Sequence, residues 1–484
     1  MLTRRKVAAL FVFSIIAILL TAGAAPHARA QARSQSGGGQ KLVPLIITGG
    51  IVVTADAEHH VFNPGAIAID GTDIVAVDTP GNIARQFEGR QTLNVAGQIV
   101  MPGLINTHTH APMVMYRGLA DDLALMEWLQ KYIFPAEAKT VTPAFVRTGT
   151  RLAVLEMIQS GTTAYADMYY FEEEIAKATK EAGLRGVLGQ TIIKFPVADA
   201  KTPAEGLTRA RTFIAQWKND PLIVPAVAPH SPYTLEEDTL KQCSALAREL
   251  QVPMLIHLGE TRDEVDIIRT QHQRSPTAYL DAIGVLGPNV LAAHGVWVSG
   301  EDIDILKTRG VGVSHNPESN MKLASGTAPV LRYLAAGVPV GLGTDGAASN
   351  NDLDMFEAMR FAALLHKLQN NDPKATPAPV VLDMATRLGA KALGLDKQIG
   401  SLEAGKRADL IMLSLDRART TPLFDPVSHI VYVAHGDDVR TVMVNGKFLM
   451  RDRKVLTLDE QRVISDARSA ALQVRDAVSA ATAR

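Results

Sequence analysis

The sequence predicts an α/β fold in which a TIM-like (β/α)₈ barrel is joined to a small β-sheet unit. Two patterns predict it. In residues 101–404, apolar strand-like stretches alternate with longer helical stretches, which is typical of parallel strands covered by helices. In residues 42–100, short β-rich runs are separated by Gly-Gly, Asn-Pro and Asp-Gly turns, which indicates a separate, smaller sheet.

Length and composition fit this picture. The chain has 484 residues, of which 47% are hydrophobic and 20% charged, so it can bury a large core and exceeds one typical domain. The formal net charge is -1, which calls for neither nucleic acid nor an anionic membrane as a partner. The chain has one cysteine, Cys243. This excludes an intrachain disulfide framework and zinc sites built from paired cysteines.

The first thirty residues predict a secretory signal peptide. Residues 4–6 are basic, residues 7–20 are apolar, and Ala28-Arg29-Ala30 matches a cleavage site. We therefore expect export to the periplasm, cleavage after Ala30 and no attachment to the membrane afterwards. An uncleaved anchor is the alternative, which the short apolar stretch disfavours. The paired arginines leave Sec and twin-arginine export both open.

Eight strand candidates in the middle of the chain each end near a polar side chain. They alternate with helical stretches such as residues 144–160 and 234–250. The candidates end near His110, Asp167, Lys194, His230, His257, His294, His315 and Asp345. Because parallel barrels carry their active sites at the C-terminal ends of their strands, these side chains should meet at one face.

Two histidines at the end of the first of these strands predict half of a metal site. His108 and His110 are two residues apart, and strand side chains alternate between faces, so both should project from one side. A lone His-x-His is also common in ordinary loops and cores. His257, His294 and Asp345 end further apolar runs. A set of histidines with one aspartate suits Zn²⁺ or another divalent transition metal.

Five motifs together resemble one family. They are Pro-Gly-Leu-Ile-Asn-Thr-His-Thr-His at 102–110, His-Leu-Gly-Glu at 257–260, His294, Ser-His-Asn-Pro-Glu-Ser-Asn-Met-Lys-Leu-Ala-Ser-Gly at 314–326 and Gly-Thr-Asp-Gly at 343–346. The set resembles the amidohydrolase superfamily, and within it the S-adenosylhomocysteine and 5′-methylthioadenosine deaminases. The resemblance covers nearly the whole chain after about residue 40.

The resemblance also implies how the chain ends are organised. In that superfamily, strands from both ends of the sequence pair in a β-sandwich beside the barrel. Here residues 31–100 and 405–458 would form the two halves of the sandwich. Residues 459–484 are rich in alanine and lack helix breakers, so we expect a terminal helix.

The resemblance further implies one divalent metal ion. Its ligands would be His108, His110, His257 and Asp345, with a water in the remaining position. We expect Zn²⁺, with Fe²⁺ and Mn²⁺ as alternatives. Metal binding lowers the pKa of such a water to about 7, which would produce a hydroxide near neutral pH. Binuclear relatives carry a bridging lysine at the end of the fourth strand, where this chain has Ala228-Pro-His-Ser231. One metal is therefore favoured, and Lys194, at the end of the third strand, is the remaining candidate for a bridge.

Three residues are expected to take part in catalysis. Glu260, three residues after His257, would act as general base and then as proton donor. The alternative is a solvated loop carboxylate. His294 would orient the water or polarise the developing charge, and Asp345 is assigned to the catalytic group as well as to the metal.

Four residues are expected to contact the substrate. The segment 125–137 resembles the family's substrate segment, in which Trp128 would pack on the ligand and Glu137 would bind ribose hydroxyls. A buried helix aromatic is the alternative for Trp128. His230 matches a family position that contacts the substrate, and Glu260 would contact the reacting ring. Residues 314–326 should form another wall.

Three functions remain open. The first is a metal-dependent hydrolytic deaminase of adenosine-type nucleosides. The second is an amidohydrolase acting on another amino- or chloro-substituted heterocycle, such as guanine, a pterin or a triazine. The third is a metal-binding or solute-binding protein without turnover, which Glu260 argues against. In each case the partner is a small molecule, with a homo-oligomer also open. Export fits the first function least well, since the expected nucleosides are intracellular.

Overall fold

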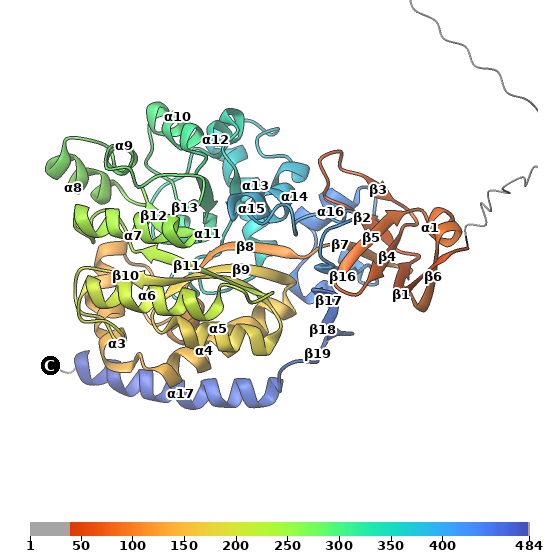
Figure 1. Ribbon diagram of the computed structural model, residues 1–484, viewed down its shortest axis with the longest axis horizontal. Helices are drawn as coiled ribbons and strands as arrows, with labels where there is room; N and C mark the ends of the chain where they lie inside the picture. The colour runs from red at the N-terminus through yellow and green to blue at the C-terminus, as the bar shows by residue number, and fades with distance from the viewer. Residues whose placement is uncertain (1–38, 483–484) are drawn as a thin grey trace, which may run out of the picture. The chain divides into compact units, whose positions relative to one another are not determined.

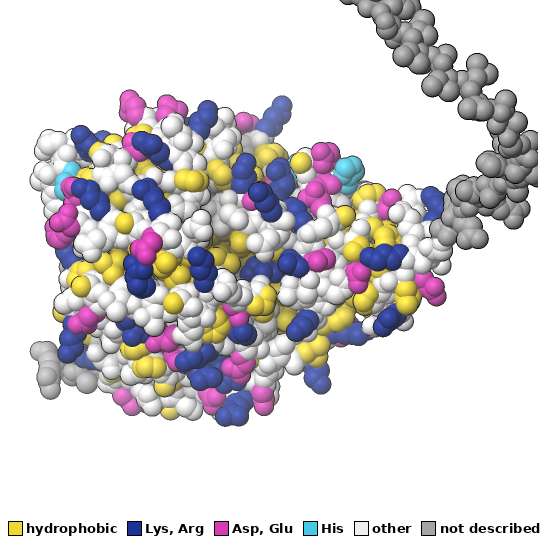
Figure 2. All heavy atoms as spheres, in the orientation of Figure 1, with side chains coloured by type: hydrophobic (Ala, Val, Ile, Leu, Met, Phe, Trp, Pro, Cys, Tyr) yellow, Lys and Arg dark blue, Asp and Glu magenta, His cyan; other side chains and the backbone are white. Residues whose placement is uncertain are grey.

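The computed structural model of the protein describes residues 39–482. The predicted signal peptide, residues 1–30, therefore lies outside the described residues. Within the described range, no helix is both long enough and apolar enough to cross a membrane. On the face drawn in Figure 2, acidic and basic side chains are interspersed rather than gathered by sign, in keeping with the near-neutral net charge.

Eight parallel strands form the barrel in sequence order. They are β8 (Leu104–Thr109), β9 (Thr162–Tyr169), β10 (Arg185–Ile192), β11 (Ile223–Pro229), β12 (Met254–Leu258), β13 (Val290–His294), β14 (Gly312–His315) and β15 (Val340–Leu342). The first and last strands meet where the Thr107 hydroxyl donates to the Leu342 carbonyl at 2.9 Å. The Asp345 N–H also donates to the His108 carbonyl at 3.0 Å. The predicted (β/α)₈ barrel is confirmed, with each strand ending within three residues of its predicted end.

Helices lie around the outside of the barrel strands (Figure 1). The main ones are α4 (Pro143–Gln159), α5 (Glu172–Ala182), α6 (Pro203–Trp217), α7 (Glu237–Leu250), α8 (Arg262–His272), α9 (Pro276–Ala282), α10 (Gly300–Arg309), α12 (Val330–Ala336) and α13 (Met355–Asn370). Thr142, Thr202 and Ser275 each accept a backbone N–H of the helix that follows, and each precedes a proline. An oxygen-bearing cap followed by proline at the first position is a strong helix start.

The remaining helices are mostly short. They are α1 (Pro80–Gln86), η1 (Ala111–Tyr116), α2 (Leu125–Trp128), η2 (Leu129–Ile133), α3 (Phe134–Thr140), α11 (Pro317–Lys322), α14 (Ala378–Ala385), α15 (Arg387–Ala392), η3 (Ala418–Thr420), α16 (Pro426–Tyr432) and η4 (Gly436–Asp438).

The apolar run that leads into the first two histidines forms two strands rather than one. β7 (Gln98–Pro102) belongs to another sheet, and β8 of the barrel starts at Leu104. Gly103 lies between them, at a position where a Cβ would lie 2.1 Å from the Thr163 side chain, so the close packing requires glycine. A periodicity argument cannot find this break, since residues 99–105 on both sides of it form one continuous apolar run.

Strands from both chain ends form two further sheets. A four-stranded sheet has the order β5-β4-β1-β6 and a seven-stranded sheet the order β19-β18-β17-β16-β7-β2-β3. Their members are β1 (Lys41–Thr48), β2 (Ile51–Val53), β3 (Val61–Phe62), β4 (Ala66–Asp70), β5 (Asp73–Asp78), β6 (Phe87–Asn94), β16 (Leu410–Ser414), β17 (Val439–Val444), β18 (Lys447–Arg451) and β19 (Lys454–Val455). Ile47 and Ile67 of one sheet pack in one buried cluster with Val100 and Leu410 of the other. The predicted pairing of the chain ends is confirmed by the antiparallel ladder between β7 and β16.

The C-terminal helix lies against the barrel. α17 (Glu460–Thr482) packs on α3 and α4, and Figure 1 shows it running beside them. The Gln159 side chain donates to Glu460 at 3.0 Å, and Lys139 donates to the Ala477 carbonyl at 3.1 Å. The predicted terminal helix is confirmed within the described residues.

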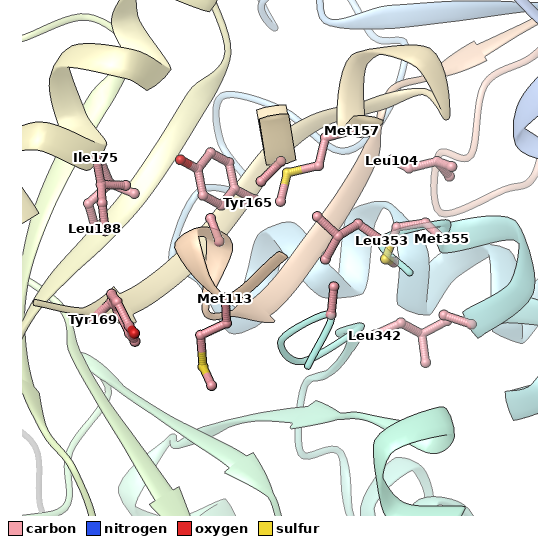
Figure 3. Packing of buried hydrophobic residues seen from close by; sticks show 14 of the residues in the cluster. Leu104, Met113, Met157, Tyr165, Tyr169, Ile175, Leu188, Leu342, Leu353 and Met355 are labelled. Atoms are coloured by element: carbon pink, nitrogen blue, oxygen red, sulfur yellow. The ribbon is translucent and has the colours of Figure 1, made fainter. Parts of the chain in front are cut away.

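Large buried side chains fill the layer between the strands and the outer helices. Tyr165 of β9 and Met157 of α4 point into this layer and lie next to one another (Figure 3). The Tyr165 hydroxyl pairs with the Thr179 hydroxyl of α5, so its polar group is satisfied away from water. This packing leaves the strand ends to carry the polar side chains.

Candidate metal centre and active site

Four predicted ligands meet at the C-terminal ends of three barrel strands. The Nε2 atoms of His108 and His110 each lie 3.3 Å from Asp345 Oδ1. His257 Nε2 lies 3.3 Å from His110 Nε2. His108 and His110 therefore point to the same side of β8, as the spacing predicted.

The geometry of this cluster fits a divalent metal ion. Ligand atoms bound about 2.0–2.1 Å from a tetrahedral zinc lie roughly 3.3 Å from one another. His108 Nε2 and Asp345 Oδ1 are also buried without a hydrogen-bond partner. Unpaired polar atoms are costly inside a protein unless something binds them. A cation among these atoms would satisfy them.

Hydrogen bonds behind the cluster fix which way each ligand faces. His110 Nδ1 donates to the Met168 carbonyl at 2.6 Å, and His257 Nδ1 donates to the His230 carbonyl at 2.7 Å. With Nδ1 protonated, each neutral ring presents the Nε2 lone pair to the cluster. The second carboxylate oxygen of Asp345 accepts from two serine hydroxyls. Sequence reasoning missed these supports.

Burial keeps the ligands in the states that bind metal. Burial lowers the pKa of His108 to about 4 and that of His257 well below its usual value, so both rings are neutral at pH 7. Burial alone would raise the pKa of Asp345, but the neighbouring imidazoles hold it well below its usual value. Neutral imidazoles and an ionised carboxylate are the forms required of metal ligands.

Two residues at the strand ends adopt left-handed backbone conformations. His294 has φ of 73° and Asp345 has φ of 61°. Such conformations are uncommon for residues other than glycine and cluster at functional sites. Here they accompany the turns that aim both side chains into the barrel mouth.

Glu260 lies beside the cluster and is held by its own turn. His294 Nε2 lies 3.9 Å from Glu260 Oε1, and His294 Nδ1 lies 2.9 Å from Asn320 Oδ1. The Glu264 carboxylate accepts the N–H groups of Gly259 and Glu260 at 2.8 and 3.0 Å. Burial raises the pKa of Glu260, as suits a group that both takes and gives a proton. Glu260 is therefore not the solvated loop carboxylate of the alternative interpretation.

His294 also comes close to the cluster itself. Its ring nitrogen, with ligand atoms of His108 and His257, forms a group in which all atoms lie within 4.8 Å of one another. The structure therefore brings a fifth metal-capable side chain to the four predicted ligands. Burial would lower the pKa of His294, but Glu260 and Asp345 raise it above its usual value. A protonated ring would donate from Nε2 toward Glu260 or a substrate.

A cavity opens above the cluster and contains the predicted substrate residues. It encloses about 650 Å³, counting the part open to solvent, and Trp128, Glu137, His230 and Glu260 all line it. Trp128 is both buried and in the cavity wall, so the two interpretations of this residue are compatible. The roles of these residues remain predictions.

Burial shifts the pKa of both Glu137 and His230. Glu137 accepts a hydrogen bond from the Tyr169 hydroxyl at 2.6 Å. Burial raises the pKa of Glu137 to about 7 and lowers that of His230 to about 3. Perturbed carboxylates and imidazoles in one cavity are characteristic of a functional site.

Lys194 lies apart from the predicted metal site. The residue is exposed, and its Nζ lies 3.4 Å from the Tyr233 carbonyl. Neither metal-capable group at the strand ends contains it. The wall expected from residues 314–326 is present in part, since Leu323 lines the cavity and Ser319 donates to Asp345 at 2.7 Å.

Glu264 is the supporting residue that a sequence pattern could have found. Thr261 and Glu264 have the Thr-x-x-Glu spacing of a capping box. The Thr261 hydroxyl does accept the Glu264 N–H, at 3.3 Å. The Glu264 side chain reaches further back, to the turn that carries Glu260.

Comparison with known proteins agrees with this geometry. The model of the amidohydrolase family matches residues 99–449 of the chain. The chain belongs to the amidohydrolase family. This confirms the predicted resemblance, and both the four predicted metal ligands and Glu260 lie inside the matched segment.

Named relatives cover nearly the whole amidohydrolase chain. It is 46% identical over 437 residues, 90% of the chain and 100% of the relative, to a 5-methylthioadenosine/S-adenosylhomocysteine deaminase of Syntrophobacter fumaroxidans. It is 44% identical over 432 residues, 89% of the chain and 98% of the relative, to a 5′-deoxyadenosine deaminase of Methanosarcina mazei. A crystal structure of an adenosine deaminase from Xanthomonas campestris with bound zinc superposes with a TM-score of 0.89. That structure is 39% identical and covers 90% of this chain and 100% of its own.

Proposed function

We propose that this amidohydrolase is a metal-dependent hydrolytic deaminase of adenosine-type nucleosides. The observation that carries the proposal is Glu260, a buried carboxylate of raised pKa beside a cluster of metal-type ligands. A protein that only bound a metal or a solute would have no need of such a group. The names of the relatives support the nucleoside substrate, because they concern methylthioadenosine, S-adenosylhomocysteine and 5′-deoxyadenosine.

The proposed reaction replaces the exocyclic amine of the purine by oxygen. Water adds to the ring carbon that bears the amine. Glu260 takes one proton from this water and delivers it to the ring nitrogen beside that carbon. The second proton of the water goes to the amine, which leaves as ammonia. His294, 3.9 Å from Glu260, would hold the adding oxygen in place through its ring N–H.

The metal would be held by His108, His110, His257 and Asp345. When bound, it supplies a water whose pKa is lowered to near 7. We propose zinc, since the histidine-rich cluster suits it and the adenosine deaminase structure from Xanthomonas campestris contains it. Fe²⁺ and Mn²⁺ also accept histidine and carboxylate ligands, so metal analysis decides between them.

The substrate would lie with its purine against the cluster and its ribose toward the helical wall. Trp128 and His230 would contact the ring system, and Glu137 would accept hydrogen bonds from the ribose hydroxyls. The position of Glu137 supports this, because its carboxylate lines the cavity from α3, outside the barrel strands.

The test is ammonia release from a panel of substrates by metal-analysed protein. The panel contains adenosine, 5′-deoxyadenosine, 5′-methylthioadenosine, S-adenosylhomocysteine, guanine, a pterin and a chlorotriazine. We expect ammonia from the adenosine derivatives and little from the others. Turnover confined to guanine, the pterin or the triazine would replace the proposed substrate class by another heterocycle. No turnover of any of these compounds would contradict the proposal that the protein is an enzyme of this class.

A further inference from the structure

A second cavity adjoins the one above the metal cluster. It encloses about 950 Å³, counting the part open to solvent. The aromatic rings of Phe134, Tyr170 and Phe195 line it, together with residues 196–198, which are Pro-Val-Ala. Phe134 and Phe195 meet edge to face, with ring centroids 5.3 Å apart. We call this space the outer cavity and the one above the cluster the inner cavity.

The two cavities share part of their walls. Phe134, Glu137 and Tyr170 line both. Glu137 therefore lies where they meet. If its carboxylate holds the ribose hydroxyls, the purine extends into the inner cavity, and the 5′ carbon of the ribose is close to the outer one. A substituent on that carbon would then enter the outer cavity.

The outer cavity offers no cationic partner. Among residues 39–482, neither cavity is lined by lysine or arginine. Lys194 is exposed, with its Nζ 3.4 Å from the Tyr233 carbonyl. Arg209 is engaged by Asp199 at 3.2 Å and by Glu173 at 2.7 Å. Within the described range, the one carboxyl group that lines the outer cavity is that of Glu137, which would repel another carboxylate.

We propose that the outer cavity receives the 5′ substituent of the nucleoside and selects substituents that carry no charge. This rests on the proposed function. The favoured substrates are 5′-deoxyadenosine and 5′-methylthioadenosine. S-adenosylhomocysteine is disfavoured, because its amino-acid end carries a carboxylate for which the cavity wall has no lysine or arginine partner. Charged groups that lose water without a partner weaken binding.

The decisive comparison is between 5′-methylthioadenosine and S-adenosylhomocysteine, which share the purine, the ribose and the thioether sulfur. We expect kcat/KM to be at least about tenfold higher for 5′-methylthioadenosine, the cost of leaving one charged group poorly paired. We also expect roughly a threefold gain over adenosine from burial of the added methylthio group. Equal or better turnover of S-adenosylhomocysteine would overturn the proposal.

A variant that adds a cation tests the location. Ala198 is exposed and lines the outer cavity, so Ala198→Arg should be accommodated without disturbing the core. It should shift the ratio of kcat/KM toward S-adenosylhomocysteine by roughly threefold to tenfold, as expected for one charge-assisted contact. The matched control is Ala215→Arg, an exposed position on α6 outside both cavities. A ratio that is the same in both variants would mean that the 5′ group does not reach this cavity.

Binding measurements separate this proposal from the proposed function. Calorimetry on Glu260→Gln reports the affinity for each nucleoside without turnover. If no nucleoside is deaminated by the wild-type protein but 5′-methylthioadenosine still binds at least about tenfold more tightly than S-adenosylhomocysteine, the cavity assignment stands and the reaction is wrong. If the two bind equally, the cavity assignment is wrong whatever the reaction.

Discussion

The walls of the inner and outer cavities are formed by different kinds of side chain. The inner wall is formed by the strand-end cluster of His108, His110, His257 and Asp345, of which the last three line the inner cavity. These three also have hydrogen bonds behind them that set their direction. The outer wall consists of Phe134, Glu137, Tyr170 and Phe195, which lie on α3 or follow β9 and β10. Three of these four residues are aromatic, and their rings are held by packing rather than by hydrogen bonds between charged or polar groups.

This difference assigns the reaction to the inner wall and the choice of substrate to the outer wall. The inner wall is fixed by paired polar groups, so its geometry should vary little with the substrate. Part of the outer wall lies on a helical segment, in which α2, the π-helical turn η2 and α3 come one after another. Single π-helical turns are frequent at functional sites. We therefore expect changes in the inner wall to alter turnover for every substrate, and changes in the outer wall to alter the choice among substrates.

Replacement of Glu260 should have the largest effect. Glu260→Gln keeps the shape but cannot take a proton, so kcat should fall by roughly 10²-fold or more for all substrates. Metal content should stay near that of the wild-type protein. Glu301→Gln, at an exposed position on α10, is the control and should leave turnover unchanged. Near-normal kcat in Glu260→Gln would assign the proton transfer to another group.

Replacement of Glu137 should discriminate between substrates. Glu137→Gln loses charge-assisted hydrogen bonds to the ribose, an effect of about 1.5–3 kcal/mol in kcat/KM for nucleosides. Free adenine, which lacks ribose, should be almost unaffected. Glu127→Gln on α2 is the control, since Glu127 is exposed and pairs with Lys131. Equal losses of kcat/KM for adenine and adenosine would mean that Glu137 takes part in the reaction rather than in binding the ribose.

The same variant should change the pH dependence. Burial raises the pKa of Glu137 to about 7, so the wild-type carboxylate is lost as the pH falls from about 8 to about 6. The amide that Glu137→Gln introduces does not titrate in this range. The ratio of wild-type to variant kcat/KM for nucleosides should therefore decrease by up to about tenfold as the pH falls. A ratio that does not depend on pH would show that the ionised form of Glu137 does not matter.

Loss of Glu264 should have a moderate effect. Glu264→Ala removes the acceptor of the Gly259 and Glu260 N–H groups, which leaves two donors unpaired and costs about 1–3 kcal/mol of stability. The turn that aims Glu260 should loosen, so we expect kcat to fall roughly tenfold with little change in KM. Glu264→Gln keeps one acceptor and should recover part of the loss. Unchanged kcat in a destabilised Glu264→Ala protein would reduce Glu264 to a structural role.

Removal of residues 1–30 should have the smallest effect on either wall. We propose that the chain is exported and cleaved after Ala30, on the basis of the basic and apolar segments that precede Ala28-Arg29-Ala30. A chain that starts at Gln31 should keep the substrate preference and the kcat of the full-length protein. Mass measurement of the protein from its native host checks the cleavage. An intact Met1 in a cytoplasmic fraction would refute it.

The inner wall could largely be predicted from the sequence. Histidines and an aspartate at the ends of apolar strands must meet once the barrel forms, so the positions of His108, His257 and Asp345 follow from alternation and topology. The hydrogen bonds behind them could not be predicted. They join residues far apart in the chain, such as His110 with Met168 and Asp345 with Ser319.

The outer wall needed the structure. Trp128 and Glu137 are predicted to contact the substrate only through the family resemblance, because a helical segment of mixed apolar and charged residues has no distinctive spacing. Phe195 lies in a loop after β10, and no periodicity predicts where such a loop folds. The break at Gly103 could not be predicted either, because residues 99–105 are one apolar run that passes from one sheet to another.

The number of metal ions bound per chain tests the central claim about the inner wall most directly. The claim is that three imidazoles and one carboxylate hold a single divalent ion. Elemental analysis of protein purified without chelators should find about one ion per chain in the wild-type protein, because the four predicted ligands lie in one cluster, where each is 3.3 Å from another, and a fifth position would be left for water. Two tightly bound ions per chain, or none, would contradict the account.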